Sequence, residues 1–286
     1  MDLYLGAPKA LLRPMGLGYA LAHEMDSEVT IQKYKATNKL ILDNGADELG
    51  EGLGGEKLAY LTGKLDPYFL ILPDVLHKPK KTRLRSLEFL SKMKDAGYKG
   101  QFMAVIQDKD KKKAANSILE WSCSAGVNRL GITYDTKIVT NDPSPESWMR
   151  RLDFLEWFIS EYKQELNNVD FHLLGTLEVN ELYRLFHLDR YAEVRKYVAS
   201  HDTTAPYACP TRFVVDQSGT ISFGREKNWK SLNFGKQSFS GGELDTIAWN
   251  TACYLAACKV PKQKWTWYMD KVMADMMYAQ FENYCV

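Results

Sequence analysis

The stretch LILDNGADELGEG, residues 40–52, combines two patterns that do not belong to one element. Residues 40–42 form a short apolar run, which is typical of a buried strand. The run stops at Asp43, and Asn44-Gly45 and a segment rich in acidic residues and glycines follow at once. A strand that ends on a carboxylate and opens into such a loop is typical of parallel α/β proteins, in which the loops after the strands build the functional site.

The same pattern recurs downstream. Further short apolar runs each stop abruptly at a polar residue or glycine, and runs of this kind suit parallel strands that are buried on both faces. These runs are YFLILPD ending at Asp74, FMAVIQD at Gln107 and Asp108, NRLGITYD at Asp135, VDFHLLGT at Gly175 and Thr176, and YVASHD at Asp202.

The segments between these runs carry helical patterns. Residues 83–96 place Leu84, Leu87, Leu90 and Met93 at helical spacing, with Gly97 as a cap. Residues 112–125 place Ala115, Ile118 and Leu119 on one face before Gly126, and a further helix is expected from Ser144-Pro145, with an apolar stripe through Trp148, Leu152, Leu155 and Ile159. Strands and helices therefore alternate along the chain.

This alternation predicts an α/β protein with a (β/α)8 TIM-like barrel. The strand ends lie about 30 residues apart, the length of one βα unit. LYLGAP near the N-terminus supplies a further strand, and one more is needed between residues 10 and 38. The rival is an open doubly wound sheet, but no G-x-G-x-x-G follows the first strand, which weakens its nucleotide-binding version.

The chain of 286 residues fits one barrel domain with a C-terminal extension over about residues 211–286. RFVVDQSGTISFG predicts a hairpin around Ser218-Gly219. The aromatic and Met-rich segment 264–284 has helical spacing, and we expect it to pack on the barrel as core or to form a homodimer surface.

Composition limits the classes of protein. The net charge of +1 gives no strong overall field, and no apolar run is long enough to span a bilayer. The N-terminus lacks the pattern of a signal peptide. Five cysteines, with no C-x-x-C pair, indicate free thiols in a reducing, cytoplasmic compartment and argue against a structural zinc site.

The strand ends supply the candidate site. In a parallel α/β fold Asp43, Asp74, Gln107 and Asp202 converge at one mouth. Each aspartate alone has a simpler explanation, since Asp43 suits an Asx-turn and Asp74 and Asp202 suit helix caps. The four together favour a functional site.

The ordered set of motifs resembles the tRNA-guanine transglycosylases, which exchange guanine for a 7-deazaguanine in a nucleic acid. The resemblance runs from residue 40 to residue 203. The family's Asp-Ser-Gly-Gly motif corresponds to Asp43-Asn44-Gly45-Ala46, its next aspartate to Asp74, its Val-Gln-Gly glutamine to Gln107, its Gly-Gly-Leu motif to Leu130-Gly131-Ile132, its Met-Gly-Val-Gly motif to the stretch around Gly175, and its Phe-Asp-Cys motif to His201-Asp202-Thr203.

The sequence also departs from this family. The C-x-C-x-x-C…H zinc subdomain is missing, and Pro210-Thr211-Arg212 lies too far from Asp202 to equal the family's Pro-Thr-Arg. A compact, zinc-free chain is similar to the phage-encoded relatives that modify DNA. The resemblance therefore implies a DNA acceptor, with tRNA as the alternative, a free base such as 7-cyano-7-deazaguanine, no cofactor, and the cytoplasm of the host cell as the location.

The implied reaction assigns a role to each residue. Asp202 is the expected nucleophile, which forms a covalent aspartyl-glycosyl intermediate in a double displacement. Asp43 is the expected general acid and then base. Asp74 accepts from guanine N1–H and N2–H₂, while Gln107 and the Gly131 N–H donate to O6. Asn44, Gly45 and Gly175 complete the base site. His172 and His201 are expected packing residues, unless His201 tunes Asp202.

Two basic runs offer phosphate contacts. Residues 77–85 and 108–113 follow Asp74 and Gln107, and Lys80, Lys81, Lys111 and Lys112 are the candidate phosphate ligands. Charge runs are more often solvated helix starts, but cations at helix N-termini oppose the helix dipole. Two rival functions stay open: a metal-dependent barrel enzyme that uses Asp43, Asp74 and Asp202, and a barrel that binds nucleic acid without turnover.

Overall fold

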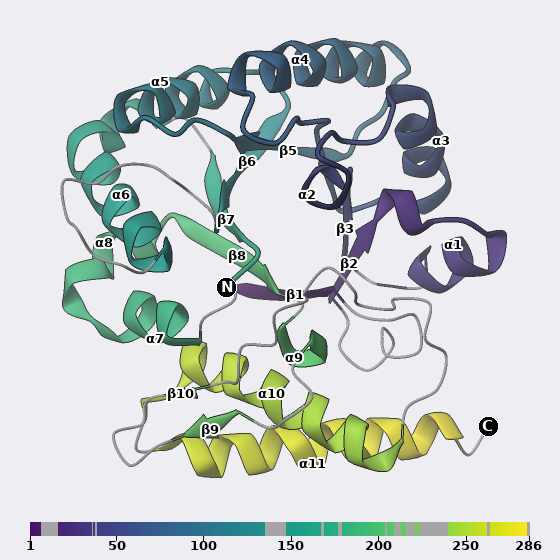
Figure 1. The fold of residues 1–286 in the computed structure, drawn as a ribbon, viewed down its shortest axis with the longest axis vertical. Helices are drawn as coiled ribbons and strands as arrows, with labels where there is room; N and C mark the ends of the chain where they lie inside the picture. Colours follow the sequence, from purple (N-terminus) through teal and green to yellow (C-terminus); the bar gives the residue numbers. More distant parts are fainter. Residues whose placement is uncertain are drawn as a thin grey trace.

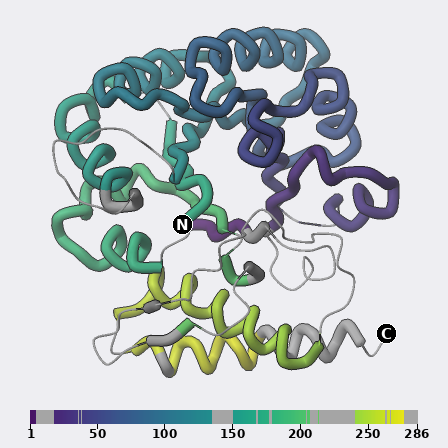
Figure 2. Tube along the Cα trace, viewed as in Figure 1, coloured from purple at the N-terminus to yellow at the C-terminus, as the bar shows by residue number. Residues whose placement is uncertain are grey.

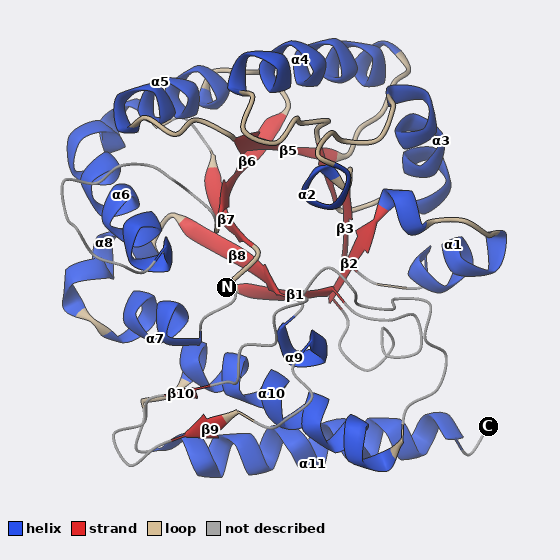
Figure 3. Cartoon of the chain, viewed as in Figure 1, coloured by secondary structure: helices blue, strands red, loops and turns tan. Residues whose placement is uncertain are grey.

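Eight parallel strands close into a barrel, in the order in which they occur along the chain (Figures 1 and 3). The computed structural model describes residues 1–6, 17–35, 37, 39–134, 147–166, 169–176, 179–203, 205–208, 213–215, 221–222, 240–261 and 264–284. The strands are β1 Asp2–Gly6, β2 Leu17–Leu21, β3 Lys39–Asp43, β4 Phe69–Ile71, β5 Gln101–Ile106, β6 Val127–Thr133, β7 Asp170–Leu174 and β8 Val198–Thr203.

Helices surround this ring of strands, and the colour gradient in Figure 2 follows the chain around the barrel. The fold is thus a (β/α)8 TIM-like barrel, as the sequence predicts, and β2 is the strand that was expected between residues 10 and 38. The helices are α1 Glu28–Lys35, α2 Ala46–Leu49, α3 Gly55–Leu65, α4 Pro79–Asp95, α5 Lys111–Ser122, α6 Ser147–Tyr162, α7 Val179–His187, α8 Ala192–Arg195, α9 Ala205–Ala208, α10 Gly241–Lys259 and α11 Trp265–Tyr284, with 3-10 turns at Ala22–Glu24, Lys163–Glu165 and Asp189–Tyr191.

The outer faces of the strands pack on the helices. Leu42, Leu70, Ala104 and Ile132 belong to one buried cluster together with side chains of α3 to α6. Burial of each large apolar side chain contributes roughly 1.5–3 kcal/mol relative to exposure, so this outer shell stabilises the barrel.

The stripe expected on residues 83–96 is partly wrong. Leu90 and Met93 are buried, but Leu84 and Leu87 are 73% and 39% exposed. Phe89 faces the barrel instead, together with the small polar residues Thr82 and Ser86. Periodicity alone did not separate these two faces of α4, because both carry apolar residues.

The inner faces of the strands divide into two kinds. A cluster of apolar and aromatic side chains fills the interior beside β1 to β5: Tyr4, Tyr19, Leu21, Ile41, Phe69, Ile71, Met103 and Val105. On β6 to β8 the alternate positions that face inward carry polar residues instead: Arg129, Asp170, His172, Ser200 and Asp202.

The C-terminal helices cover the barrel beside β1 and α7. Trp265 and Met269 of α11 and Tyr254 of α10 share a cluster with Leu3 of β1 and Leu182 of α7. Segment 264–284 therefore forms core in its first turns, while Trp267 is 64% exposed.

Several expectations fall near the edge of the described chain. Val214–Val215 and Ile221–Ser222 pair antiparallel, which confirms the predicted hairpin strands, while its turn lies outside the described residues. Asp135, the helix start at Ser144-Pro145 and Pro210-Thr211-Arg212 also lie outside them. In the described part of the chain, no helix has the length and apolar character needed to cross a membrane.

Candidate active site

Asp43 lies where β3 ends, at the mouth of the barrel, and both of its carboxyl oxygens are engaged. Oδ2 accepts a hydrogen bond from the Tyr19 hydroxyl at 2.5 Å, and Oδ1 accepts one from the Gly45 N–H at 3.1 Å. Burial raises the pKa of Asp43 to about 8, and the nearby Glu48 carboxylate adds to the shift. The Asp43 carboxyl is therefore mainly protonated at neutral pH.

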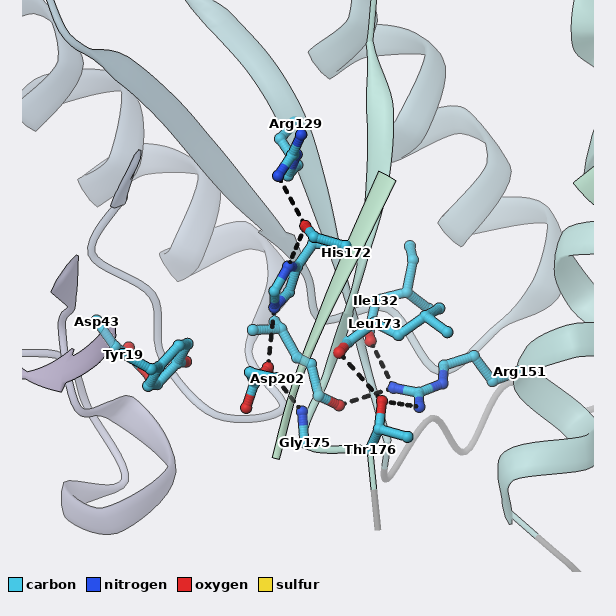
Figure 4. Close-up of polar contacts among 12 residues, drawn as sticks. Tyr19, Asp43, Arg129, Ile132, Arg151, His172, Leu173, Gly175, Thr176 and Asp202 are labelled. Atoms are coloured by element: carbon cyan, nitrogen blue, oxygen red, sulfur yellow. Dashed lines mark hydrogen bonds and ion pairs between the residues drawn. The ribbon is translucent and has the colours of Figure 1, made fainter. Parts of the chain in front are cut away.

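Tyr19 is a donor at all ordinary pH values. Its pKa is raised well above the usual range by burial and by the charges of Asp43 and Asp202. The phenol therefore keeps its proton and points it at Asp43 (Figure 4). Asp43 and Asp202 both lie toward the carboxyl ends of their parallel strands, at the same mouth of the barrel.

Gly45 is needed for the local geometry after β3. Its φ of 76° lies in the left-handed region, and a Cβ there would lie 2.3 Å from His23 Nδ1. No other residue fits both constraints. The turn aims the Gly45 N–H at Asp43, so Gly45 supports the acid.

Asp74, Asn44 and Gln107 form a buried hydrogen-bond network. Asn44 Nδ2 donates to Asp74 Oδ1 at 2.8 Å, and Gln107 Nε2 donates to Oδ2 at 2.5 Å. Gln107 Oε1 in turn accepts from the His77 N–H at 3.0 Å. Burial raises the pKa of Asp74, although the two amide donors oppose the shift. These three predicted base-binding side chains therefore meet, as the convergence of strand ends requires.

The segment 50–53 covers this network. The Gly52 N–H donates to the Asp74 carbonyl at 2.8 Å, and a Cβ on Gly52 would lie 2.1 Å from Asn44 Oδ1. Asp74 is 3% exposed, and Asn44 Oδ1 is buried without a hydrogen-bond partner in the described part of the chain. Contact between a base and the Asp74 carboxylate therefore requires segment 50–53 to move.

Asp202 is held in a different way, inside β8. Its Oδ1 accepts hydrogen bonds from His172 Nε2 at 2.9 Å and from the Gly175 N–H at 3.0 Å (Figure 4). Gly175 has a φ of 62° at the turn after β7, which aims its N–H at the carboxylate. Gly175 thus contacts the candidate nucleophile directly.

The expectation that His201 tunes Asp202 is wrong, because consecutive side chains of a strand face opposite sides. His201 points outward from the barrel, where its Nε2 lies 3.9 Å from Cys258 Sγ and its ring stacks near Tyr254. Burial lowers its pKa well below the usual range. The histidine beside Asp202 is His172, two positions into β7 from the end that faces the mouth.

Gly131 lies within β6, paired with Val105 of β5 and His172 of β7. A Cβ at this position would meet Leu174 Cδ1 at 2.6 Å. Gly131 therefore makes room for an apolar side chain below the mouth.

A buried ion pair supports the turn beside Asp202. Arg151 of α6 and Glu181 of α7 are both fully buried and form a bidentate pair at 2.7 and 2.5 Å. Arg151 Nη1 also donates to the carbonyls of Ile132 and Leu174, at 2.9 and 2.7 Å. Arg151 thereby ties the ends of β6 and β7 together immediately before Gly175.

The four candidate phosphate ligands lie in the first turns of α4 and α5, which follow the ends of β4 and β5. Lys80 and Lys112 are exposed. Lys81 Nζ is 2.7 Å from Glu51 Oε2, and Lys111 Nζ lies 3.9 Å from the centre of the Trp157 ring. Burial lowers the pKa of Lys111. Two of the four cations therefore already have partners.

Several residues at the site were not expected from the sequence: Tyr19, Glu48, Arg151, His172 and Ser200. The signal for two of them was present in alternation. Asp170 and His172 occupy alternate positions in DFHLL, and Ser200 and Asp202 do so in VASHDT, which predicts one polar face on each strand. Within the described residues, no group of three or more His, Cys, Asp or Glu side chains is placed to hold a metal ion.

Comparison of the sequence with protein-family models and with curated proteins gives no match.

Proposed function

We propose that this protein is a nucleic-acid guanine transglycosylase, which exchanges guanine for a 7-deazaguanine base by double displacement. The observation that carries the proposal is that the two carboxyl groups at the mouth, those of Asp43 and Asp202, have different surroundings. The pKa of Asp43 is raised to about 8 by burial and by Glu48, whereas Asp202 receives two hydrogen bonds on one oxygen. Two carboxyl groups whose environments differ in this way suit an acid and a nucleophile.

Each group has one role in the reaction. Asp202 attacks C1′ of the target nucleotide, and the C1′–base bond breaks as Asp43 gives its proton to the leaving guanine. Asp43 then takes a proton from the incoming base, which attacks C1′ and releases the Asp202 carboxylate. Because C1′ undergoes two displacements, first by Asp202 and then by the incoming base, its configuration is retained.

The surroundings of this pair fit a nucleic acid. A purine within a duplex is out of reach of a barrel mouth, so the nucleotide is flipped out or single-stranded. Asp74, Asn44 and Gln107 form one network beside Asp43 and supply the polar groups for base recognition. The exposed cations of α4 and α5 offer phosphate contacts. We propose DNA as the acceptor because the chain lacks the zinc subdomain of the tRNA-modifying family.

The test is incubation of the purified protein with labelled guanine and either DNA or tRNA. Incorporation of label into DNA that Asp202→Ala abolishes supports the proposal, and label in tRNA alone changes only the acceptor. The same reaction with a chelator separates the metal-dependent alternative, because base exchange by two carboxyl groups continues in its presence. Binding of DNA with no incorporation of any base contradicts the proposal.

A further inference from the structure

Four polar side chains form a continuous chain through the barrel interior below the mouth (Figure 4). Arg129 Nη1 lies 2.7 Å from Ser200 Oγ, Ser200 Oγ lies 2.7 Å from His172 Nδ1, and His172 Nε2 lies 2.9 Å from Asp202 Oδ1. The four residues come from β6, β7 and β8, which are adjacent strands. Arg129, His172 and Ser200 are buried, and the chain ends at the candidate nucleophile.

The chemistry of Arg129 fixes one end of this chain and limits the directions of the other hydrogen bonds. Arg129 has no acceptor, so it donates to Ser200 Oγ. The Ser200 hydroxyl then has its own proton available for His172 Nδ1. With Nδ1 as an acceptor, the proton of a neutral imidazole lies on Nε2, which donates to Asp202.

Burial of His172 favours this neutral form. Burial lowers the pKa of His172, and the charges of Arg129 and Arg151 lower it further, while Asp202 opposes them. The charge of Arg129 is itself compensated by Asp170, with which it forms two hydrogen bonds, one of 2.8 Å. Arg151 is paired with Glu181. The ring is therefore a neutral donor between fixed cations and one carboxylate.

The two oxygens of Asp202 are consequently not equivalent. Oδ1 accepts from both His172 and the Gly175 N–H, whereas Oδ2 has no hydrogen bond to any of the described residues. An oxygen with two donors is less nucleophilic than one with none, and it holds the carboxylate in place.

We propose that His172 is a positioning residue, locked by Ser200 and Arg129 as the Nε2–H tautomer, which anchors Asp202 by Oδ1 and leaves Oδ2 as the attacking oxygen. The identity of the attacked carbon rests on the proposed function, but the anchoring does not. In the reaction a lone pair of Oδ2 forms the bond to C1′, the C1′–base bond breaks, and its electron pair leaves with the base, which Asp43 protonates. The incoming base reverses these steps and restores the carboxylate.

Two variants of His172 test this role in catalysis. His172→Phe removes the donor and is expected to lower kcat about 10- to 100-fold, the usual effect of losing a hydrogen bond to a charged group. KM changes little, because His172 does not face the substrate. His172→Gln retains an amide donor and is expected to recover most of the activity.

A measurement without substrate separates this proposal from the proposed function. In protein labelled with ¹³C-aspartate, the Asp202 carboxyl signal, assigned with Asp202→Asn, is expected to move in His172→Phe and to stay near its wild-type position in His172→Gln. His187→Gln is the matched control, because His187 bonds only to the Ala257 carbonyl in the described part of the chain and its loss leaves the Asp202 signal unchanged. If the wild type exchanges no base but the Asp202 signal moves as expected, the positioning role stands and the proposed function fails.

The tautomer is read in the wild-type protein, so that the result does not depend on how a variant folds. The ¹⁵N spectrum of the His172 ring is expected to show a protonated Nε2 and an unprotonated Nδ1 across neutral pH. Ser200→Ala removes the lock and is expected to give a mixture of tautomers and a smaller loss of kcat than His172→Phe. A ring protonated on Nδ1 in the wild type, or an Asp202 carboxyl signal that His172→Phe leaves unchanged, overturns the proposal.

Discussion

The two halves of the barrel interior differ in what lies beneath the mouth. Beside β1 to β5 the interior is filled by aromatic and aliphatic side chains, and Asp43 lies above them. Beside β6 to β8 it contains Arg129, Ser200 and His172, and Asp202 lies above these. Both aspartates lie at or beside the carboxyl end of a strand of the same barrel.

This difference shows that the environment divides the roles of identical side chains. The apolar side chains beneath Asp43 destabilise its charged form, so the pKa of Asp43 rises to about 8. Hydrogen bonds from His172 and from the Gly175 N–H anchor the Asp202 carboxylate. Hydrogen bonds to a charged acceptor are stronger than those between neutral groups. In the proposed mechanism, the two halves of the interior thus suit the same residue type to two roles, an acid and a nucleophile.

Removal of the nucleophile has the largest expected effect on this comparison. Asp202→Ala is expected to lower base exchange by on the order of 10⁴-fold or more, because the covalent step is lost. Circular dichroism and thermal unfolding check that the fold remains. Turnover close to that of the wild type would remove Asp202 from the mechanism.

The stability of the half beside β6 to β8 is expected to depend on the buried ion pair between Arg151 and Glu181. Arg151→Leu leaves Glu181 buried without its cation, and such a loss costs about 3–5 kcal/mol in the free energy of unfolding. Denaturant unfolding measures this cost. The matched control is Lys92→Leu, which breaks an exposed pair with Glu88 in α4 and is expected to cost far less, because solvent screens an exposed pair. Equal losses would show that Arg151 does not support the turn before Gly175.

A third aspartate, Asp74, tests whether the network beside Asp43 reads the base. Asp74→Asn places an amide donor against the donors of Asn44 and Gln107, so one hydrogen bond is mispaired, at a cost of about 1–3 kcal/mol. Guanine affinity, measured by calorimetry, is expected to fall by this amount. A fall in unfolding free energy with unchanged affinity for guanine would leave Asp74 as a structural residue only.

The lysines in the first turns of α4 and α5 lie outside the barrel interior. We expect them to affect the binding of DNA but not the exchange of the base. Replacement of Lys80, Lys81, Lys111 and Lys112 by Gln together is expected to weaken DNA binding for all sequences and to flatten its salt dependence by about one unit of slope per lost phosphate contact. Base preference is expected to survive, because phosphate contacts position the strand. Lys81 contributes least, since Glu51 already holds it. An unchanged salt slope would place the nucleic acid elsewhere.

The smallest expected effect concerns how the reaction rate depends on pH through Asp43, in the half of the barrel with the apolar interior. Guanine release needs protonated Asp43, so its rate is expected to fall as the pH rises through about 8. Burial and Glu48 raise the pKa of Asp43, while the Tyr19 hydrogen bond lowers it. Tyr19→Phe therefore raises this pKa further, and the basic limb of the pH–rate profile moves to higher pH. Movement to lower pH would contradict the role of Tyr19.

The strands and the convergence of their ends could be predicted from the sequence. Short apolar runs that end on Asp43, Asp74 and Asp202 at the period of a βα unit require a parallel sheet, and eight strands close it. The network of Asp74, Asn44 and Gln107 follows from the same logic, because strand ends meet at one edge.

Other features of the site depend on relations that no run of residues carries. The alternation in VASHDT indicates that Ser200 and Asp202 share a face, but it does not say that His172 of a neighbouring strand lies between them. Tyr19 meets Asp43 across two adjacent strands. Arg151 of α6 reaches the carbonyl of Leu174, immediately before Gly175, across a separation of 23 residues in the chain.

The sequence by itself determined the barrel and the type of residue at each strand end, because hydrophobic periodicity acts locally and parallel strands have few ways to pack. Only the tertiary structure decided that Asp43 lies over apolar side chains and that Asp202 lies over a chain of hydrogen-bonded polar side chains. Burial and hydrogen bonding depend on contacts between residues far apart in the chain, such as Arg129 and Ser200, and these contacts set the surroundings of each carboxyl group.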